Sequence, residues 1–273
     1  MESLRSLSRD SALPRLEFQM LWQHVLQVPR VWLIAHDGDP VDPAKAARFR
    51  ELQARRLAGE PMAYILGVRE FMGRDFHVSP AVLIPRPETE LLVEAGLRHL
   101  EGLKSPRVLD LGTGTGAIAI CIALDRPDAR VAGSDSSAQA LDVAKHNAQT
   151  LGAAVDFFHG SWYDALPAIG GFDLIVSNPP YIAASDPHLK QGDLRFEPAS
   201  ALTDHGDGLA ALREIAQGAG QWLAPQGALL MEHGWDQAAA VRGIMESSGF
   251  GRVTSLPDLA GVERVTGGIY NEG

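Results

Sequence analysis

A glycine-rich loop between two apolar segments most constrains what this chain can fold into. Residues 108–111 read V-L-D-L and predict a buried strand, residues 112–116 read G-T-G-T-G, and the apolar run 117–124 predicts a helix. Glycines let the backbone turn sharply and approach a ligand closely, and the N-terminus of a helix attracts anions. The stretch is therefore typical of the first strand, loop and helix of a nucleotide-binding α/β domain.

Strands and helices continue to alternate after this loop. Further strands are predicted at 130–135, 154–158, 172–177 and 228–231, and helices at 138–150 and 209–223. Strands separated by helices favour a parallel, doubly wound, Rossmann-like sheet. No helix separates the last two predicted strands, 253–256 and 264–266, so we expect the sheet to end in an antiparallel hairpin.

The first 68 residues have a different character. Apolar side chains recur at helical spacing from Phe18 to Val25, and Asp42 followed by Pro43 predicts the start of another helix. We therefore expect a small helical bundle at 1–68. Because this segment carries no catalytic motif, we expect it to recognise the substrate.

Residues 69–90 link the bundle to the α/β part. Polar and apolar residues alternate around Gly73, which predicts a β-hairpin. The stretch 84–90, I-P-R-P-E-T-E, is stiffened by two prolines, and Pro87 is expected to open a helix with acidic residues in its first turn. The domain boundaries are thus expected at 1–68, 69–90 and 91–273.

Charge and composition restrict the class of partner. Residues 81–273 contain 13 Lys and Arg against 24 Asp and Glu, a net charge of −11. Tight binding to a nucleic acid needs several basic side chains on one face, so we expect no direct nucleic-acid partner. The histidines show no metal-ligand spacing, and we expect no bound metal.

The remaining composition points to a reducing compartment. The one cysteine, Cys121, falls in the apolar helix pattern and is expected to be a core thiol. No apolar run follows Met1, and no segment approaches 18 consecutive apolar residues, so neither a signal peptide nor a membrane span is expected. We expect a cytoplasmic monomer.

The glycine loop leaves two cofactors open. Gly112, Gly114 and Ala117 fit the dinucleotide pattern G-x-G-x-x-G/A, and Asp135 ends the second predicted strand, where ribose hydroxyls are held. An NAD-dependent enzyme is therefore one alternative.

Two further residues favour S-adenosylmethionine. Asp110 stands two residues before the first glycine, where a carboxylate suits an ammonium group, and Gly116 adds a third position of close approach at the helix start. S-adenosylmethionine offers a carboxylate, an ammonium group and a ribose diol to such a loop.

The sequence Asn178-Pro179-Pro180-Tyr181 follows the buried strand 172–177. The amide of Asn178 would stand at the rim of the sheet, where ligands of open α/β sheets bind. The two prolines fix the backbone and lack N–H donors, so nearby carbonyl groups remain available as acceptors. With the ring of Tyr181 beside them, these acceptors suit an NH2 group.

These motifs together resemble the class I methyltransferases that act on planar NH2 groups. Over roughly residues 15–270 the chain resembles the protein-(glutamine-N5) methyltransferases that modify peptide chain release factors, the HemK/PrmC family. Ser161 departs from the family pattern, which often has an acidic residue just before the tryptophan. The further stretches that carry the resemblance are 59–67, 70–71, 76–78, 83–90, 186–188, 195–198 and 263–265.

The resemblance implies methylation of the side-chain nitrogen N5 of the GGQ glutamine in peptide chain release factors, with S-adenosylmethionine as cofactor. The side-chain oxygen of Asn178 and the Pro179 carbonyl would accept the two N–H bonds of the substrate amide, and no general base is expected. The expected residues are Asn178, Pro179 and Tyr181 for catalysis, these three with Pro180 for substrate, and Asp110, Gly112, Thr113, Gly114, Thr115, Gly116, Asp135, Trp162 and Asn178 for cofactor.

Two other functions share parts of this pattern. An adenine-N6 methyltransferase acting on DNA or RNA also carries N-P-P-Y, but would need a basic groove. A non-catalytic module that only binds S-adenosylmethionine would not need Asn178 and Tyr181.

Overall fold

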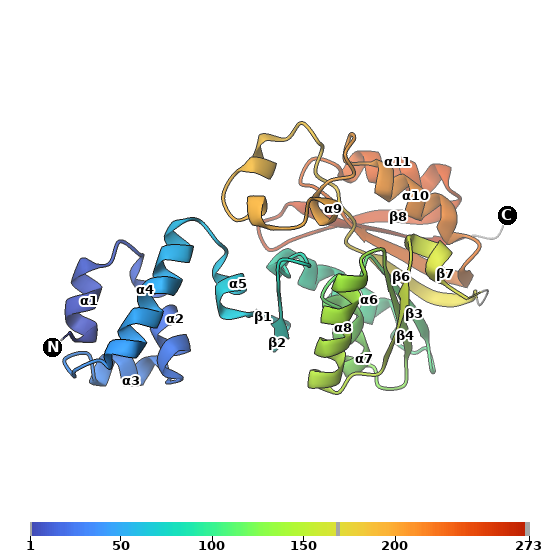
Figure 1. Ribbon diagram of the computed structural model, residues 1–273. Helices are drawn as coiled ribbons and strands as arrows, with labels where there is room; N and C mark the ends of the chain where they lie inside the picture. The colour runs from blue at the N-terminus through green and yellow to red at the C-terminus, as the bar shows by residue number, and fades with distance from the viewer. Residues whose placement is uncertain (1, 168–169, 271–273) are drawn as a thin grey trace. The chain divides into compact units, whose positions relative to one another are not determined.

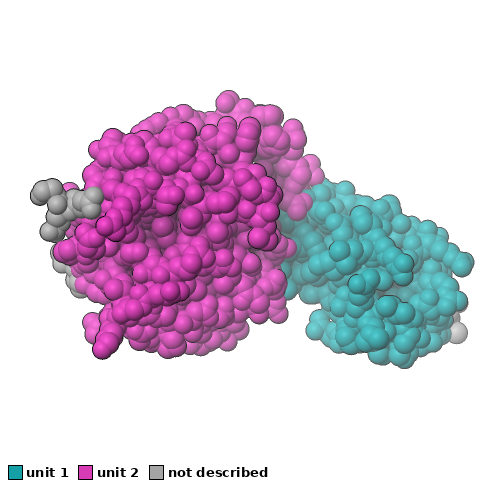
Figure 2. Space-filling view, turned by 180° about the vertical axis from the view of Figure 1, so that it is seen from behind, with its two compact units in different colours: residues 1–68 teal, residues 69–273 magenta. Residues whose placement is uncertain are grey.

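The computed structural model describes residues 2–167 and 170–270. The chain divides into two compact units, residues 1–68 and 69–273, which Figure 2 distinguishes by colour. Within the described residues no helix combines the length and the apolar character that a membrane crossing needs.

The first unit is helical, as expected. Its core is built around Trp22, which stacks on Phe49 with ring centroids 4.4 Å apart, and around Leu21 and Leu52, both fully buried. Asp42 caps the fourth helix by accepting a hydrogen bond from Ala44 N at 2.7 Å. Residues 2–68 form the helices α1 (Leu4–Asp10), α2 (Arg15–Leu26), α3 (Arg30–Ala35), α4 (Pro43–Leu57) and α5 (Met62–Leu66).

The second unit begins with the predicted hairpin, β1 (Val68–Phe71) and β2 (Arg74–His77). Both turn residues are left-handed, with φ of 51° at Met72 and 71° at Gly73, which matches the twist of a tight hairpin. The connector then enters η1 (Pro87–Thr89) and α6 (Glu90–His99), so Pro87 does open a helical segment.

A seven-stranded sheet forms the centre of the second unit, with strand order β5-β4-β3-β6-β7-β9-β8. The first five in that order are parallel, and β9 and β8 are antiparallel, so the predicted sheet and terminal hairpin are confirmed. The strands are β3 (Arg107–Leu111), β4 (Arg130–Asp135), β5 (Val155–His159), β6 (Phe172–Ser177), β7 (Leu223–Glu232), β8 (Phe250–Pro257) and β9 (Glu263–Tyr270).

Helices cover both faces of this sheet (Figure 1). Successive residues of a strand point to opposite faces, and accordingly Val108 packs in one apolar cluster while Leu109 packs in the other. Cys121 is fully buried in the first cluster, and burial raises the pKa of its thiol to about 12, so it is the predicted core thiol. The covering helices are α6, α7 (Ala117–Asp125) and α8 (Ala138–Leu151) on one face, and α10 (Ala210–Ala219) and α11 (Ala238–Ser247) on the other.

The predicted boundaries near residue 223 are wrong. The helix expected to reach residue 223 ends at Ala219, where Gly218 and Gly220 weaken it, and Trp222 N closes a turn on Ala219 O at 2.9 Å. Leu223 already belongs to β7 and pairs with Phe172.

The carboxyl ends of the parallel strands meet at one edge. Leu111 pairs with Ser134 and with Ser177, and Ser177 pairs with Met231. The residues that follow these four strand positions are therefore neighbours in space, whatever their separation in the sequence.

Asn147 of α8 connects the hairpin to the glycine loop. Its Oδ1 accepts from His77 N at 2.8 Å, and its Nδ2 donates to His77 O and Thr115 O at 3.0 Å each. The side chain of Asn147 is 1% exposed, so water could not readily replace it as the hydrogen-bond partner of these backbone groups.

Replacing Asn147 by Ala is expected to lower the free energy of unfolding by about 3 kcal/mol, because buried backbone groups lose their partners. Urea unfolding followed by circular dichroism measures this. Gln149→Ala, an exposed amide on the same helix, is the matched control and should change little. Equal stability of the two variants would contradict the bridging role of Asn147.

Candidate active site

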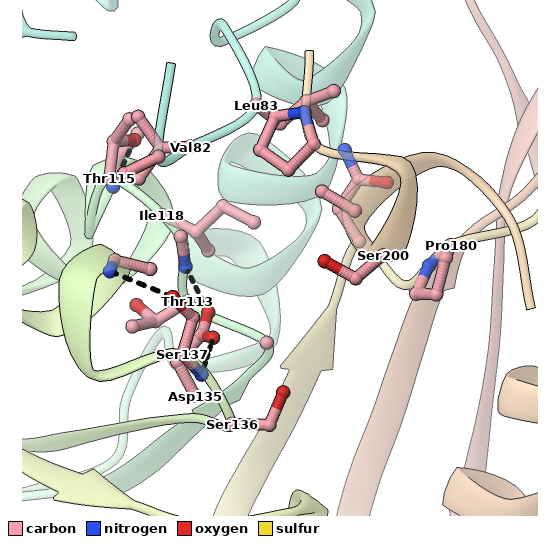
Figure 3. A pocket seen from close by; sticks show the side chains of 18 of the residues that line it. Val82, Leu83, Thr113, Thr115, Ile118, Asp135, Ser136, Ser137, Pro180 and Ser200 are labelled. Atoms are coloured by element: carbon pink, nitrogen blue, oxygen red, sulfur yellow. Dashed lines mark hydrogen bonds between the residues drawn. The ribbon is translucent and has the colours of Figure 1, made fainter. Parts of the chain in front are cut away.

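A cavity of about 180 Å³ opens at the carboxyl edge of the sheet. Its walls come from the glycine loop, the end of β4, the segment at 161–162, the residues after β6, and two outer segments at 81–89 and 198–201. In Figure 3, Thr113, Asp135 and Ser137 lie on one side of the cavity, and Pro180 and Ser200 lie on the other. The cavity therefore collects segments that are far apart in the chain.

The glycine loop requires glycine for two different reasons. Gly114 has φ of 55°, lines the cavity, and has nothing within 4 Å of the position where a Cβ would stand. Gly116 has φ of 80°, but a Cβ there would lie 2.8 Å from Ile120 and 3.2 Å from the Cβ of Ala144. Gly114 thus leaves room for a ligand, whereas Gly116 allows α7 to pack closely on α8 and is not part of the cavity wall.

Asp135 holds the loop in place from the end of β4. Its Oδ2 accepts from Gly114 N and its Oδ1 from Ser137 N, both at 2.8 Å. Burial raises the pKa of this carboxyl group, and the two backbone N–H groups oppose the rise. Each oxygen has a second lone pair that can accept a hydroxyl hydrogen, and Asp135 lines the cavity.

Asp110 lies beneath the loop and is fully buried. Its Oδ2 accepts from the Thr113 hydroxyl at 2.6 Å, whereas Oδ1 has no hydrogen-bond partner among the described residues. Burial raises the pKa of Asp110 to about 7. An unpartnered buried acceptor beside the loop fits a cationic group, although Asp110 itself is not part of the cavity wall.

Trp162 begins η2 (Trp162–Ala165) with a φ of 41°, an unusual conformation for a large side chain. Its carbonyl oxygen accepts from the Ser134 hydroxyl at 3.1 Å. Its ring lies beside Gly112, where a Cβ would approach it to 3.3 Å. Trp162 and Gly112 therefore form one continuous piece of the cavity wall. Thr113 and Thr115 of the loop also line the cavity.

Asn178 follows β6 and lines the cavity. Its Nδ2 donates to Thr89 Oγ1 at 3.1 Å, so Oδ1 is the end of the amide that remains as an acceptor. Pro179 is buried, and Pro180 lines the cavity beside Asn178. Neither proline offers an N–H group that would compete for the acceptors.

Tyr181 is held at two points outside the cavity wall. Its hydroxyl donates to Glu232 Oε1 at 3.2 Å, and its carbonyl oxygen accepts from Gln237 Nε2 at 2.9 Å. Burial and the neighbouring Glu232 raise the pKa of the phenol, which stays protonated. The expected packing of its ring against a substrate amide stays a prediction.

Glu197 joins the two outer segments. Its side chain is fully buried, accepts from Ile84 N at 3.0 Å and pairs with Arg86. Glu197 belongs to one of the stretches that carry the family resemblance, but the sequence does not indicate its partner, which lies 111 residues away.

Four other contributors were also missed. Thr89 and the two serines after Asp135 line the cavity, and Glu232 stands behind it. Glu232 had a visible signal, because an acid directly after the apolar strand 228–231 is placed at the ligand edge of the sheet.

Comparisons with known proteins indicate the family of this chain. The family model of the PrmC N-terminal domain matches residues 3–67, and that of the methyltransferase small domain matches residues 88–207. The chain is 60% identical to the release factor glutamine methyltransferase of Bordetella pertussis over 268 residues, which cover 98% of this chain and 99% of that protein. It is 56% identical to the protein of the same name from Neisseria gonorrhoeae over 261 residues, 95% of each.

Among solved structures, a methyltransferase from Pyrococcus furiosus superposes with a TM-score of 0.54 at 16% identity, covering 81% of this chain and 99% of that chain. This likeness shows the methyltransferase fold. Together with the two relatives, which are similar over nearly the whole chain, it confirms the resemblance seen in the sequence. The chain belongs to the release factor glutamine methyltransferase family.

Proposed function

We propose that this protein transfers a methyl group from S-adenosylmethionine to the side-chain nitrogen N5 of the GGQ glutamine in peptide chain release factors. Family membership supports the reaction and the substrate class. The structural observation that carries the proposal is the anchored amide of Asn178, whose nitrogen is bound to Thr89 and whose oxygen remains as an acceptor at the cavity.

The residues at the cavity offer partners for the functional groups of S-adenosylmethionine. Asp135 offers carboxylate lone pairs to a ribose diol, and the carboxyl group of Asp110, buried beneath the loop, would favour an ammonium group in the cavity. Trp162 would border the adenine, and the start of α7 favours the carboxylate. When bound, the cofactor supplies a methyl carbon made electrophilic by a positive sulfur.

The substrate amide is a poor nucleophile because resonance, reflected in a rotation barrier of about 18–20 kcal/mol, delocalises its nitrogen lone pair. Asn178 Oδ1 and the Pro179 carbonyl would accept the two N–H bonds of that amide. Two fixed acceptors orient the nitrogen and stabilise the positive charge that develops on it. Pro180 would border the amide plane, and we propose that the ring of Tyr181 packs against that plane. The product cation is acidic enough to lose its proton to water, so no basic side chain is assigned.

The alternatives have less support. Both relatives described above are named for glutamine methylation, so adenine methylation is not proposed.

We propose further that residues 1–68 recognise the release factor, that the protein acts as a cytoplasmic monomer, and that it does not bind nucleic acid directly. The excess of acidic residues in 81–273 supports the last point.

Incubation of the protein with a purified release factor and isotopically labelled S-adenosylmethionine tests the proposal. Peptide mass spectrometry should find one added methyl group on the glutamine side chain. An unmodified release factor, or a label on another residue, would contradict it.

Replacing Asn178 by Ala is expected to reduce kcat by about a hundredfold or more, because both orientation and charge stabilisation are lost. Cofactor affinity, measured by calorimetry, should change by less than about fivefold. Gln149→Ala, remote from the cavity, serves as the control for activity. Near-normal turnover of Asn178→Ala would show that the amide acceptor is not needed.

Replacing Asp135 by Ala is expected to weaken cofactor binding by about tenfold or more, because the ribose loses its acceptor and Gly114 loses its anchor. Isothermal titration calorimetry with S-adenosylmethionine gives the affinity. Asp156→Ala, an exposed acid on the adjacent strand β5, is the matched control. Unchanged affinity in Asp135→Ala would exclude the assigned ribose contact.

A further inference from the structure

Glu232, the last residue of β7, is a buried acid that the roles above do not use. Its side chain is 1% exposed. Because Met231 pairs with Ser177, Glu232 lies one residue further along, beside Asn178 at the ligand edge. Its Oε1 accepts from the Tyr181 hydroxyl at 3.2 Å, and its Oε2 is buried without a hydrogen-bond partner among the described residues. Such an oxygen is costly to bury, which calls for a functional explanation.

Thr89 connects this acid to the amide at the cavity. Its side chain is 5% exposed and accepts from Asn178 Nδ2 at 3.1 Å. Within the described residues Glu232 Oε2 receives no hydrogen bond from the Thr89 hydroxyl, yet this hydroxyl lowers the pKa of the Glu232 carboxyl group, as a nearby donor does. A hydroxyl group has a single hydrogen to donate. If that hydrogen goes to Glu232, Thr89 can meet Asn178 only as an acceptor, and the amide nitrogen must face Thr89.

We propose that Glu232 is a positioning residue that sets the direction of the hydrogen bonds behind the substrate pocket. Its carboxylate takes the hydroxyl hydrogens of Tyr181 and Thr89. Thr89 then accepts from the nitrogen of Asn178, and the oxygen of Asn178 is presented to the NH2 group of the substrate. With the opposite orientation of the Asn178 amide, its NH2 group would face the NH2 group of the substrate, and neither could accept a hydrogen bond. This inference rests on the proposed function, because the direction matters only for a substrate carboxamide.

The charged groups around Glu232 make this arrangement sensitive to pH. Burial raises the pKa of Glu232 to about 7, and Glu88 of η1 adds to the rise. The hydroxyls of Thr89 and Tyr181 and the guanidinium of Arg264 on β9 act in the opposite direction. Below that pKa the carboxyl group keeps its proton and becomes a donor, so it no longer requires the hydrogen of Thr89.

Glu232→Gln tests the proposal, because Gln has nearly the same shape but carries a donor on one side of its head group. We expect kcat for release factor methylation to fall by about tenfold or more, with S-adenosylmethionine affinity within about twofold of wild type. The wild-type kcat should rise with pH through about 7, and this rise should be absent in the variant. Glu246→Gln, the same change on the exposed face of α11, is the matched control.

Thermal unfolding gives a second readout that does not depend on turnover. An acid with a raised pKa in the folded state destabilises the protein above that pKa and has no effect below its unfolded pKa. Glu232→Gln should therefore raise the unfolding midpoint relative to wild type more at about pH 8 than at about pH 4. An equal shift at both pH values would show that folding does not raise the pKa of Glu232 and would overturn the predicted pH dependence.

A double-mutant cycle tests whether the two residues act in one chain of hydrogen bonds. Thr89→Val removes the hydroxyl at similar volume and should lower kcat, and combining it with Glu232→Gln should add little further loss. Additive losses, or a kcat of Glu232→Gln within about twofold of wild type, would overturn the proposal. Should Glu232→Gln fail to fold, the kcat values of Thr89→Val and Thr89→Ser test the proposal instead. A kcat that falls in Thr89→Val and is retained in Thr89→Ser supports it, and equal kcat values in the two variants overturn it. Failure of the wild-type protein to methylate the release factor would instead refute the proposed function.

Discussion

The parallel pairing of β3 with β4 and β6, and of β6 with β7, decides where the candidate residues at the ends of these strands stand. Parallel strands end at the same edge, so the residue that follows each strand is placed beside its neighbours without any special contact between them. Gly112 follows β3 and Asn178 follows β6, whereas Asp135 ends β4 and Glu232 ends β7. The sheet thus brings together an anion-binding loop, an acceptor for ribose hydroxyls and an amide acceptor. The helices exclude water from its two faces.

Backbone hydrogen bonds from side chains then fix the loops that the sheet leaves at this edge. Asp135 binds two loop N–H groups, Asn147 binds the carbonyl of Thr115, and Glu197 binds Ile84 N and Arg86. Each of these acceptors or donors is mostly buried, and in such surroundings a satisfied polar group is worth more than at the surface. The cavity walls are therefore held by a few buried polar side chains.

The sequence was sufficient for the sheet, the hairpins and the glycine loop because these depend on local periodicity and on residue types that only certain turns accept. Asn178 and Asp135 could be placed for the same reason, since each directly follows or ends a recognisable apolar strand. The links between Thr89 and Asn178 and between Arg86 and Glu197 join residues 89 and 111 positions apart. No spacing rule connects such partners, because their approach follows from how the connector crosses the sheet edge. The end of the helix at Ala219 was misplaced because apolar residues continue beyond it into the next strand.

Two acids stand on either side of β6, Asp110 on β3 and Glu232 on β7, and each is fully or almost fully buried with one oxygen that lacks a partner among the described residues. Burial raises the pKa of both to about 7, so each costs stability when it is ionised in the free protein. A positively charged ligand in the cavity would offset that cost, because an opposite charge nearby favours the ionised form. On the proposed function, the positive charge of the cofactor sulfur moves to the substrate nitrogen during transfer. A cation bound at this edge would favour ionisation of both acids, and their negative charges would then favour the cation at both stages.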